Sequence, residues 1–127
     1  MTDARLTPLC RVLVVEDQYL IADMLCEVLR RAGATVLGPI GWLDEALAFA
    51  ANHEGGIDCA VVDINLHGQA SYPLIDELTR QGVHVVLASG FGADALAEPY
   101  KQYPRCEKPY RDADLIATLR AGIRASV

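Results

Sequence analysis

Five polar side chains with chemical potential stand at or just after the ends of short apolar runs in this chain. Glu16 and Asp17 follow one run and Asp63 closes another, while Ser89 ends a third and Lys108 follows a fourth. Carboxylates crowded together repel, so such a site either raises some of their pKa values or recruits a cation. Oxygen ligands of this kind suit Mg²⁺, and a hydroxyl and an ammonium group suit the oxygens of a phosphoryl group. The chemistry predicted is therefore metal-assisted phosphoryl transfer, and zinc is disfavoured because the set holds no His or Cys.

Each residue alone also has an ordinary structural explanation. Acids after a strand often cap the next helix, and Ser and Lys-Pro are common in turns and solvated loops. Asp63 is harder to explain in this way, because it closes a strongly apolar run. The prediction of a site depends on the ends of all four apolar runs meeting at one edge of one sheet.

The elements that must position these residues alternate along the chain. Apolar runs predict strands at 11–15, 34–37, 59–63, 84–88 and 105–107. Helical spacing predicts helices over about 20–29, 43–53, 74–78 and 93–98, the fourth ended by Pro99, and a last helix capped by Asp112. Strands that are apolar on both faces indicate a doubly wound α/β fold, with a parallel sheet between helices. Ligands of such sheets bind beyond the carboxyl ends of the strands, where these five residues stand.

Composition narrows the class of protein further. The chain has 127 residues, of which 52% are hydrophobic, and a net charge of −6. One domain of this size can bury a sizeable core, and the acidic balance argues against general nucleic-acid binding. No apolar stretch is long enough to span a bilayer, and the N-terminus lacks the layout of a signal peptide. Four cysteines without a Cys-x-x-Cys spacing predict reduced, buried thiols, and hence a cytoplasmic protein with no membrane contact.

In four motifs the sequence resembles the receiver domain of bacterial two-component response regulators (CheY-like proteins). The motifs are VLVVED (12–17), VVDINL (61–66), VVLASG (85–90) and EKP (107–109). The resemblance covers about residues 11–126 and implies a flavodoxin-like (βα)5 fold, with a five-stranded parallel sheet in the order 2-1-3-4-5 and helices on both faces. It predicts a single receiver domain over 1–127 with no output domain.

The same resemblance implies a role for each site residue. Asp63 would accept a phosphoryl group from a phosphohistidine, and Ser89 and Lys108 would contact its oxygens. Asp17 and Asp63 would bind Mg²⁺ (or Mn²⁺) directly, together with the main-chain carbonyl of Asn65, and Glu16 would act through a bound water. The donor would be a sensor histidine kinase or a histidine phosphotransfer protein.

The implied function is that of a stand-alone response regulator in a phosphorelay. It would catalyse only its own aspartyl phosphorylation and dephosphorylation, and would signal as a monomer or weak dimer to a downstream protein target, without nucleic acid. In this family the peptide bond between Lys108 and Pro109 is commonly cis. Phe91, two residues after Ser89, is predicted to shield the acyl phosphate from water.

Two departures from the family pattern affect the expected signalling face. Arg105 stands where receivers usually carry an aromatic switch residue, and Tyr103, of the same strand parity, is the nearest aromatic side chain. Only 19 positions separate Ser89 from Lys108, so the fourth helix is expected to be short or distorted.

Two other functions remain open at this point. Haloacid-dehalogenase-like phosphatases also use a nucleophilic Asp, Mg²⁺, Ser or Thr, and Lys, but their nucleophile follows the first strand, whereas Asp63 follows the third. A receiver-like module that binds partners without phosphorylation usually lacks one of these residues, and this chain retains them all.

Overall fold

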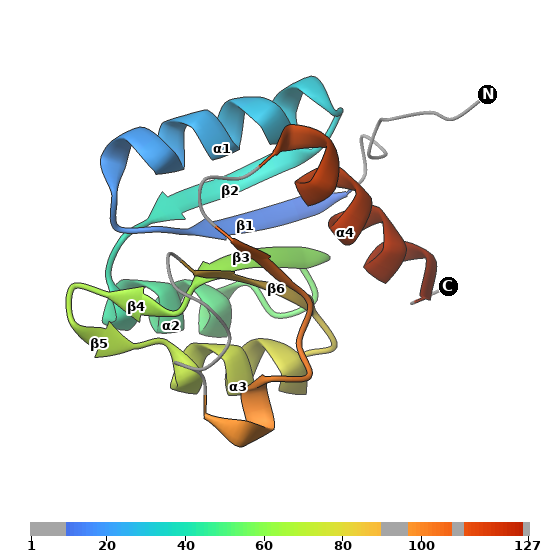
Figure 1. The fold of residues 1–127 in the computed structure, drawn as a ribbon. Helices are drawn as coiled ribbons and strands as arrows, with labels where there is room; N and C mark the ends of the chain where they lie inside the picture. Colours follow the sequence, from blue (N-terminus) through green and yellow to red (C-terminus); the bar gives the residue numbers. More distant parts are fainter. Residues whose placement is uncertain (1–9, 90–96, 108–110, 126–127) are drawn as a thin grey trace.

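The computed structural model describes residues 10–89, 97–107 and 111–125, which form a parallel sheet between helices (Figure 1). Its larger strands are β1 (Arg11–Val15), β2 (Thr35–Ile40), β3 (Cys59–Asp63), β6 (His84–Ser89) and β7 (Arg105–Glu107). The helices are α1 (Tyr19–Arg31), α2 (Leu43–Asn52), α3 (Tyr72–Arg80), the 3-10 helix η2 (Glu98–Tyr100) and α4 (Asp112–Ala125). Two short strands, β4 (Asn65–Leu66) and β5 (Gln69–Ala70), form a separate antiparallel hairpin.

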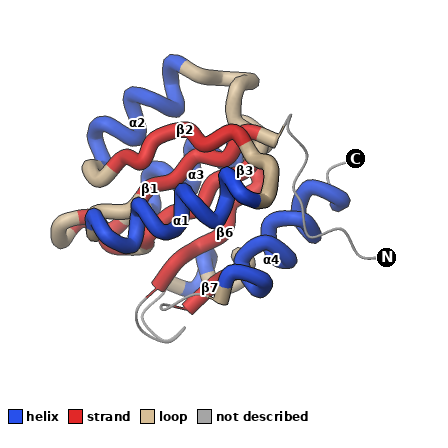
Figure 2. Tube along the Cα trace, turned by 90° about the horizontal axis from the view of Figure 1, so that it is seen from above, coloured by secondary structure: helices blue, strands red, loops and turns tan. Residues whose placement is uncertain are grey.

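The five parallel strands lie in the order β2-β1-β3-β6-β7, which Figure 2 shows across the sheet. Counted among the parallel strands alone, this is the predicted order 2-1-3-4-5, and the doubly wound α/β fold is confirmed. The chain order reverses at β1, so the carboxyl ends of β1 and β3 border the position where such folds bind ligands.

Successive side chains of a strand point to opposite faces of the sheet, so apolar residues build a core on each face. Val12 and Val14 of β1 pack with α1 and α4, whereas Leu13 and Val15 pack with α2 and α3. All of β3 is buried, as expected for a central strand covered on both faces. The two cores hold β1 and β3 rigidly up to the residues that leave the sheet at its carboxyl edge.

Helix α1 buries a narrower face than the sequence pattern predicts. Its buried residues are Ala22, Leu25, Cys26 and Leu29. Leu20 and Met24, which helical spacing assigned to the apolar face, are 78% and 69% exposed. The face that packs on the sheet consists of Leu25, Cys26 and Leu29, and Leu20 and Met24 lie outside it.

Several element boundaries also differ from those predicted. Strand β2 continues to Ile40 through a cis peptide bond between Gly38 and Pro39, instead of ending at 37. Asp112 is the first residue of α4 and not its cap. Within the predicted 93–98 helix, residues 93–96 lie outside the described part of the chain, and Pro99 lies inside η2. Pro at the first turn of a helix loses no hydrogen bond, which explains why η2 tolerates it.

Residues 97–103, which include η2, are attached to α3 through contacts of three tyrosines. The rings of Tyr72 and Tyr100 stack at 4.1 Å, and those of Tyr100 and Tyr103 lie 6.2 Å apart. Each hydroxyl has a partner: Tyr100 donates to Asp76 at 2.9 Å, Tyr103 bonds to Thr79 at 2.7 Å, and Tyr72 accepts from the Ala97 amide at 3.1 Å. We call these tyrosines and residues 97–103 the tyrosine strap.

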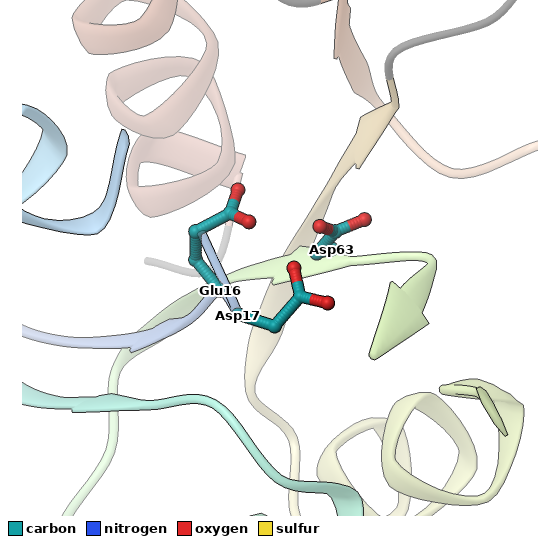
Figure 3. A group of neighbouring side chains, drawn as sticks. All are labelled: Glu16, Asp17 and Asp63. Carbon is teal, nitrogen blue, oxygen red and sulfur yellow. The ribbon is translucent and has the colours of Figure 1, made fainter. Parts of the chain in front are cut away.

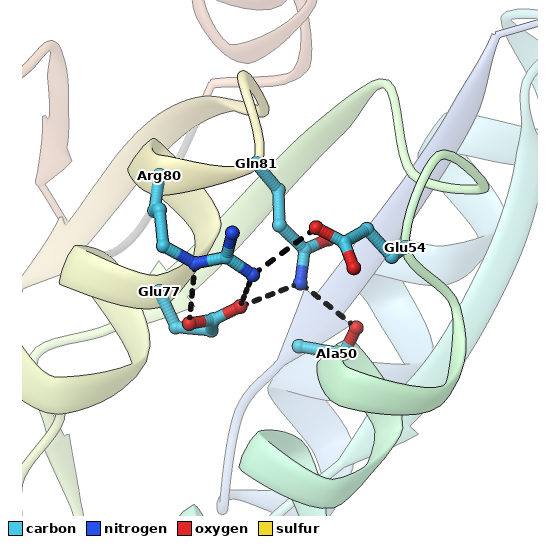
Figure 4. A network of polar contacts seen from close by, with 5 residues as sticks. All are labelled: Ala50, Glu54, Glu77, Arg80 and Gln81. Carbon is cyan, nitrogen blue, oxygen red and sulfur yellow. Dashed lines mark hydrogen bonds and ion pairs between the residues drawn. The ribbon is translucent and has the colours of Figure 1, made fainter.

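A polar network joins α3 to the end of α2 (Figure 4). Arg80 donates to Glu77 at 2.6 and 3.0 Å and to Glu54 at 3.1 Å. The Gln81 side chain donates to the same Glu77 carboxylate and to the carbonyl of Ala50. The Arg80 guanidinium, and then the Gln81 amide, lower the pKa of Glu77 from its ordinary 4.5 to about 2.

All four cysteines are buried and free, as predicted. In the part of the chain that the structure describes, no helix has the length and apolar character needed to cross a membrane.

Candidate functional site

Three carboxylates gather at the carboxyl edge of the two central strands (Figure 3). Val15 pairs with Val62 across the parallel ladder, so Glu16, the residue after β1, reaches the level of Asp63 at the end of β3. One oxygen each of Glu16, Asp17 and Asp63 lies within 4.8 Å of the others. Glu16 and Asp63 are buried, and Asp17 is half-buried. The structure thus brings together the three acids that the sequence singled out.

Backbone amides hold these carboxylates from the protein side. Glu16 accepts from the amide of Gln18 at 3.0 Å, and Asp63 accepts from the amide of Asn65 at 3.1 Å. Asp17 accepts from the amide of His67 at 2.9 Å, a contact between residues 50 positions apart. Oriented N–H dipoles of this kind favour the ionised carboxylate.

The pKa of Asp17 lies below its ordinary value. Burial acts to raise this pKa, but hydrogen bonds from the His67 amide and the Glu16 side chain, together with the His67 charge, outweigh burial. Asp17 is therefore an ionised oxygen donor at neutral pH.

The hairpin of β4 and β5 carries two of the groups next to the acids. Asn65 begins it, and the Asn65 side chain accepts from the amide of Gly68 at 2.8 Å to close its turn. His67 occupies the turn with a φ of 50°, a left-handed conformation that is uncommon for a residue other than glycine. No sequence pattern predicts this hairpin, because two-residue strands carry too few side chains for a period to be recognised.

The backbone brings Ser89 and the start of the Lys108 motif to the same edge. Asp63 pairs with Ala88, so Ser89 is one residue beyond that level, and Ser89 in turn pairs with Glu107. Lys108, Pro109 and their peptide bond lie outside the described residues, as does Phe91. The predicted contacts of Ser89 and Lys108 with a phosphoryl group therefore stay predictions, as does the shielding by Phe91.

The donor set fits a hard divalent cation. Mg²⁺ prefers oxygen ligands with one or two carboxylates, and no His or Cys side chain belongs to this cluster. Asp17 and Asp63 supply carboxylate oxygens, and the Asn65 carbonyl lies two residues after Asp63, at the start of the hairpin. The amide of Glu16 donates to the carbonyl of Ile40 at 3.0 Å, which fixes Glu16 at the end of the strand.

An aromatic pair beside the acids also escaped prediction. The indole of Trp42 stacks on the imidazole of His67, with ring centroids 3.7 Å apart and an angle of 14° between the planes. Trp42 directly precedes the first residue of α2. His67 is exposed, and its stacking partner follows from tertiary structure, because the two residues come from separate loops.

The structure places both Arg105 and Tyr103, the residues of the first departure from the family pattern. Arg105 is exposed in β7, whereas Tyr103 precedes the strand and directs its hydroxyl to Thr79 of α3. Pro104 separates Tyr103 from the strand, so the shared strand parity expected from the sequence does not apply. Tyr103 is thereby a part of the tyrosine strap.

Comparisons with solved structures agree with the observed fold. The chain is similar to SdrG from Sphingomonas melonis Fr1 (32% identity, TM-score 0.80), over 94% of this chain and 99% of SdrG. It is also similar to the BeF3-activated conformation of SdrG, with 32% identity and a TM-score of 0.74 over 89% of this chain and 94% of that one. The receiver domain of the hybrid histidine kinase CckA has the same fold, with 23% identity and a TM-score of 0.74 over 89% of this chain and 98% of that domain.

Curated sequences give a consistent result over a longer protein. The chain is 32% identical over 124 residues to the sensory transduction protein RegX3 of Mycolicibacterium smegmatis, and 31% identical to RegX3 of Mycobacterium tuberculosis. These matches cover 89% of this chain and 50% of each relative, so the chain spans about half the length of the curated relatives it matches. No family model matches the chain.

The fold and the acidic edge together define a receiver domain. The chain belongs to the receiver domains of two-component response regulators, the family to which its structural neighbours and curated relatives belong. This membership decides against the haloacid-dehalogenase-like phosphatase, whose nucleophile would follow the first strand.

Proposed function

We propose that this chain receives a phosphoryl group from a phosphohistidine onto Asp63, with Mg²⁺ (or Mn²⁺) bound at the acidic edge. The observation that carries the proposal is the convergence of Glu16, Asp17 and Asp63, with oxygens within 4.8 Å at the ends of adjacent parallel strands. Carboxylates whose oxygens lie this close repel one another when they are ionised, and a bound divalent cation offsets that repulsion.

In the proposed reaction, a carboxylate oxygen of Asp63 attacks the phosphorus atom of the phosphohistidine. The new O–P bond forms as the N–P bond breaks, and its electron pair returns to the imidazole nitrogen of the donor, which leaves an acyl phosphate on Asp63. Mg²⁺, when bound, supplies positive charge that offsets the charge of the carboxylates and of the phosphoryl oxygens.

The chain's own residues orient the nucleophile and receive the product. The Asn65 amide holds one Asp63 oxygen at 3.1 Å, which restricts rotation of the carboxylate. Ser89 would donate a hydrogen bond to the transferred group, and Lys108 would pair with its oxygens. The proposed direct metal ligands are Asp17, Asp63 and the Asn65 carbonyl, and Glu16 acts through a water.

The chain would act catalytically on no molecule but itself, and would pass the signal on through protein contacts. A sensor histidine kinase or a histidine phosphotransfer protein is the proposed donor. A protein whose binding depends on the acyl phosphate is the proposed target.

The test is incubation with acetyl phosphate and Mg²⁺, followed by intact mass measurement. We expect the gain of one phosphoryl group, its absence in Asp63→Asn, and its retention in the control Asp58→Asn. Asp58 precedes β3 and pairs with Arg11 at 3.1 Å, at the opposite end of the strand. Wild-type protein that gains no phosphoryl group from acetyl phosphate or from a phosphorylated histidine kinase would leave a phosphorylation-independent binding module as the function.

A further inference from the structure

The stack of Trp42 and His67 joins three loops at the edge of the acidic cluster. Trp42 belongs to the connection between β2 and α2, and His67 to the turn between β4 and β5. Asp17 belongs to the connection between β1 and α1, and it accepts the His67 amide at 2.9 Å. The indole of Trp42 therefore contacts His67, and His67 in turn contacts Asp17, a proposed metal ligand.

The space between these loops is closely filled. A Cβ atom at Gly41 would lie 3.4 Å from the Asp17 Cα and from the Glu16 carbonyl oxygen, and 3.9 Å from the His67 Nε2. These are ordinary van der Waals distances, so the loop of Trp42 lies close to the acidic turn, and the indole lies against the imidazole.

The hairpin has few other anchors near its turn. Leu66 is buried in the core shared with α2 and α3, but the next four residues, 67–70, are exposed. His67 holds a φ of 50°, a conformation that the isolated chain seldom adopts. The direction of the His67 amide depends on that conformation, so a contact that holds the ring also orients the amide.

We propose that Trp42 is a positioning residue for the cation site, which stacks on the His67 ring and so keeps the His67 amide on the carboxylate of Asp17. The inference rests on the proposed function, because it concerns the binding of Mg²⁺ to the same acids. The amide restrains one oxygen of Asp17, and the carboxylate therefore meets the cation already oriented. Groups that orient metal ligands in this way change metal affinity by about 10–100-fold when they are removed.

The variants separate the ring contact from the backbone contact. Trp42→Ala removes the indole, whereas Trp42→Phe retains an aromatic face. His67→Asn removes the imidazole but keeps the amide, and Asn tolerates a left-handed φ better than most residues. The matched control is His53→Asn, because His53, directly after α2, stacks on Phe49 of α2 at 3.8 Å and 10°. This similar pair contacts none of the three acids in the part of the chain that the structure describes.

The measurement is the Mg²⁺ dissociation constant of the full chain by titration calorimetry, with the free energy of unfolding measured separately without metal. We expect Trp42→Ala and His67→Asn each to raise the dissociation constant about tenfold, near the low end of the range because the amide itself remains. Trp42→Phe is expected within about twofold of wild type, and His53→Asn unchanged. The double variant is expected to bind no worse than the weaker single variant, because both changes break one contact.

The results distinguish failure of this inference from failure of the proposed function. Wild-type protein that binds no Mg²⁺ would overturn both. If Trp42→Ala and His67→Asn bind Mg²⁺ as tightly as the wild-type protein does, only the role of Trp42 is overturned. Loss of stability in these variants with an unchanged dissociation constant would assign the stack to folding alone, and would equally overturn the inference.

Discussion

Replacing Asp63 by Asn removes one of three charges that lie together, and it should make the metal-free protein more stable. The Asn side chain has the same shape, and its carbonyl oxygen can still accept the Asn65 amide that Asp63 accepts at 3.1 Å. The perturbation is therefore almost purely electrostatic.

The expected gain follows from the separation of the oxygens. At 4.8 Å, two unit charges repel by about 0.9 kcal/mol in a waterlike medium and about 3.5 kcal/mol at an effective dielectric constant of 20. Because the charge of each carboxylate is spread over two oxygens and is partly hydrated, we expect Asp63→Asn to raise the free energy of unfolding by about 1–3 kcal/mol at low salt. The gain should shrink as ionic strength rises, because the Debye length falls to about 10 Å at 0.1 M.

Mg²⁺ should reverse this order. A ligand at 100 times its dissociation constant stabilises the folded state by about 2.7 kcal/mol, and only the protein with an intact site receives this gain. The assay is urea unfolding of both proteins with and without Mg²⁺. Asp58→Asn is the control: it breaks the attractive pair with Arg11, so it should lower stability by up to about 1 kcal/mol and leave the Mg²⁺ increment unchanged.

Metal-free Asp63→Asn that is no more stable than wild type at low salt would mean that the three acids do not repel in the folded protein. An Mg²⁺ increment that survives the substitution would separately show that Asp63 is not a ligand.

Three further predictions concern the structure around the site. Glu77 has a lowered pKa in the folded state, so its contact with Arg80 adds stability above pH 4.5 that is lost as the pH falls to about 2; Glu77→Gln should flatten the pH dependence of urea unfolding in this window. Gly38→Ala should destabilise the fold by about 1–3 kcal/mol, because φ is +95° and the new Cβ would lie 2.9 Å from the carbonyl oxygen of Val14; a melting temperature equal to wild type would contradict this. Leu78→Ala should cost about 2–5 kcal/mol in denaturant unfolding, since Leu78 is fully buried in the core under α2 and α3; a loss below about 1 kcal/mol would mean that this core relaxes around the gap.

The sheet and the acidic edge were predictable because both follow from the order of apolar and charged residues within short segments of the chain. Strand β3 is apolar throughout and ends in Asp63, so both its burial and its charged end can be read from five residues. Parallel strands then bring Glu16 and Asp63 to one edge as a matter of topology, with no need to know any side-chain angle.

The parts that escaped prediction depend on contacts between separate loops. The stacking of Trp42 on His67 and the bond from His67 to Asp17 join residues far apart in the chain, and no local periodicity encodes them. The exposure of Leu20 and Met24 escaped prediction because helical spacing says which residues share a face, but not how wide a part of that face the sheet covers.

The tyrosine strap has a mechanical consequence for the whole domain. Helix α3 follows the hairpin that leaves Asp63, and it carries the Asp76 and Thr79 side chains to which the strap is bonded. Residues 97–103 therefore cannot separate from α3 without losing the hydrogen bonds of all three tyrosine hydroxyls and the stack of Tyr72 on Tyr100 together. The segment and the helix are thus joined as one unit, which lies in the chain between the hairpin that follows β3 and strand β7.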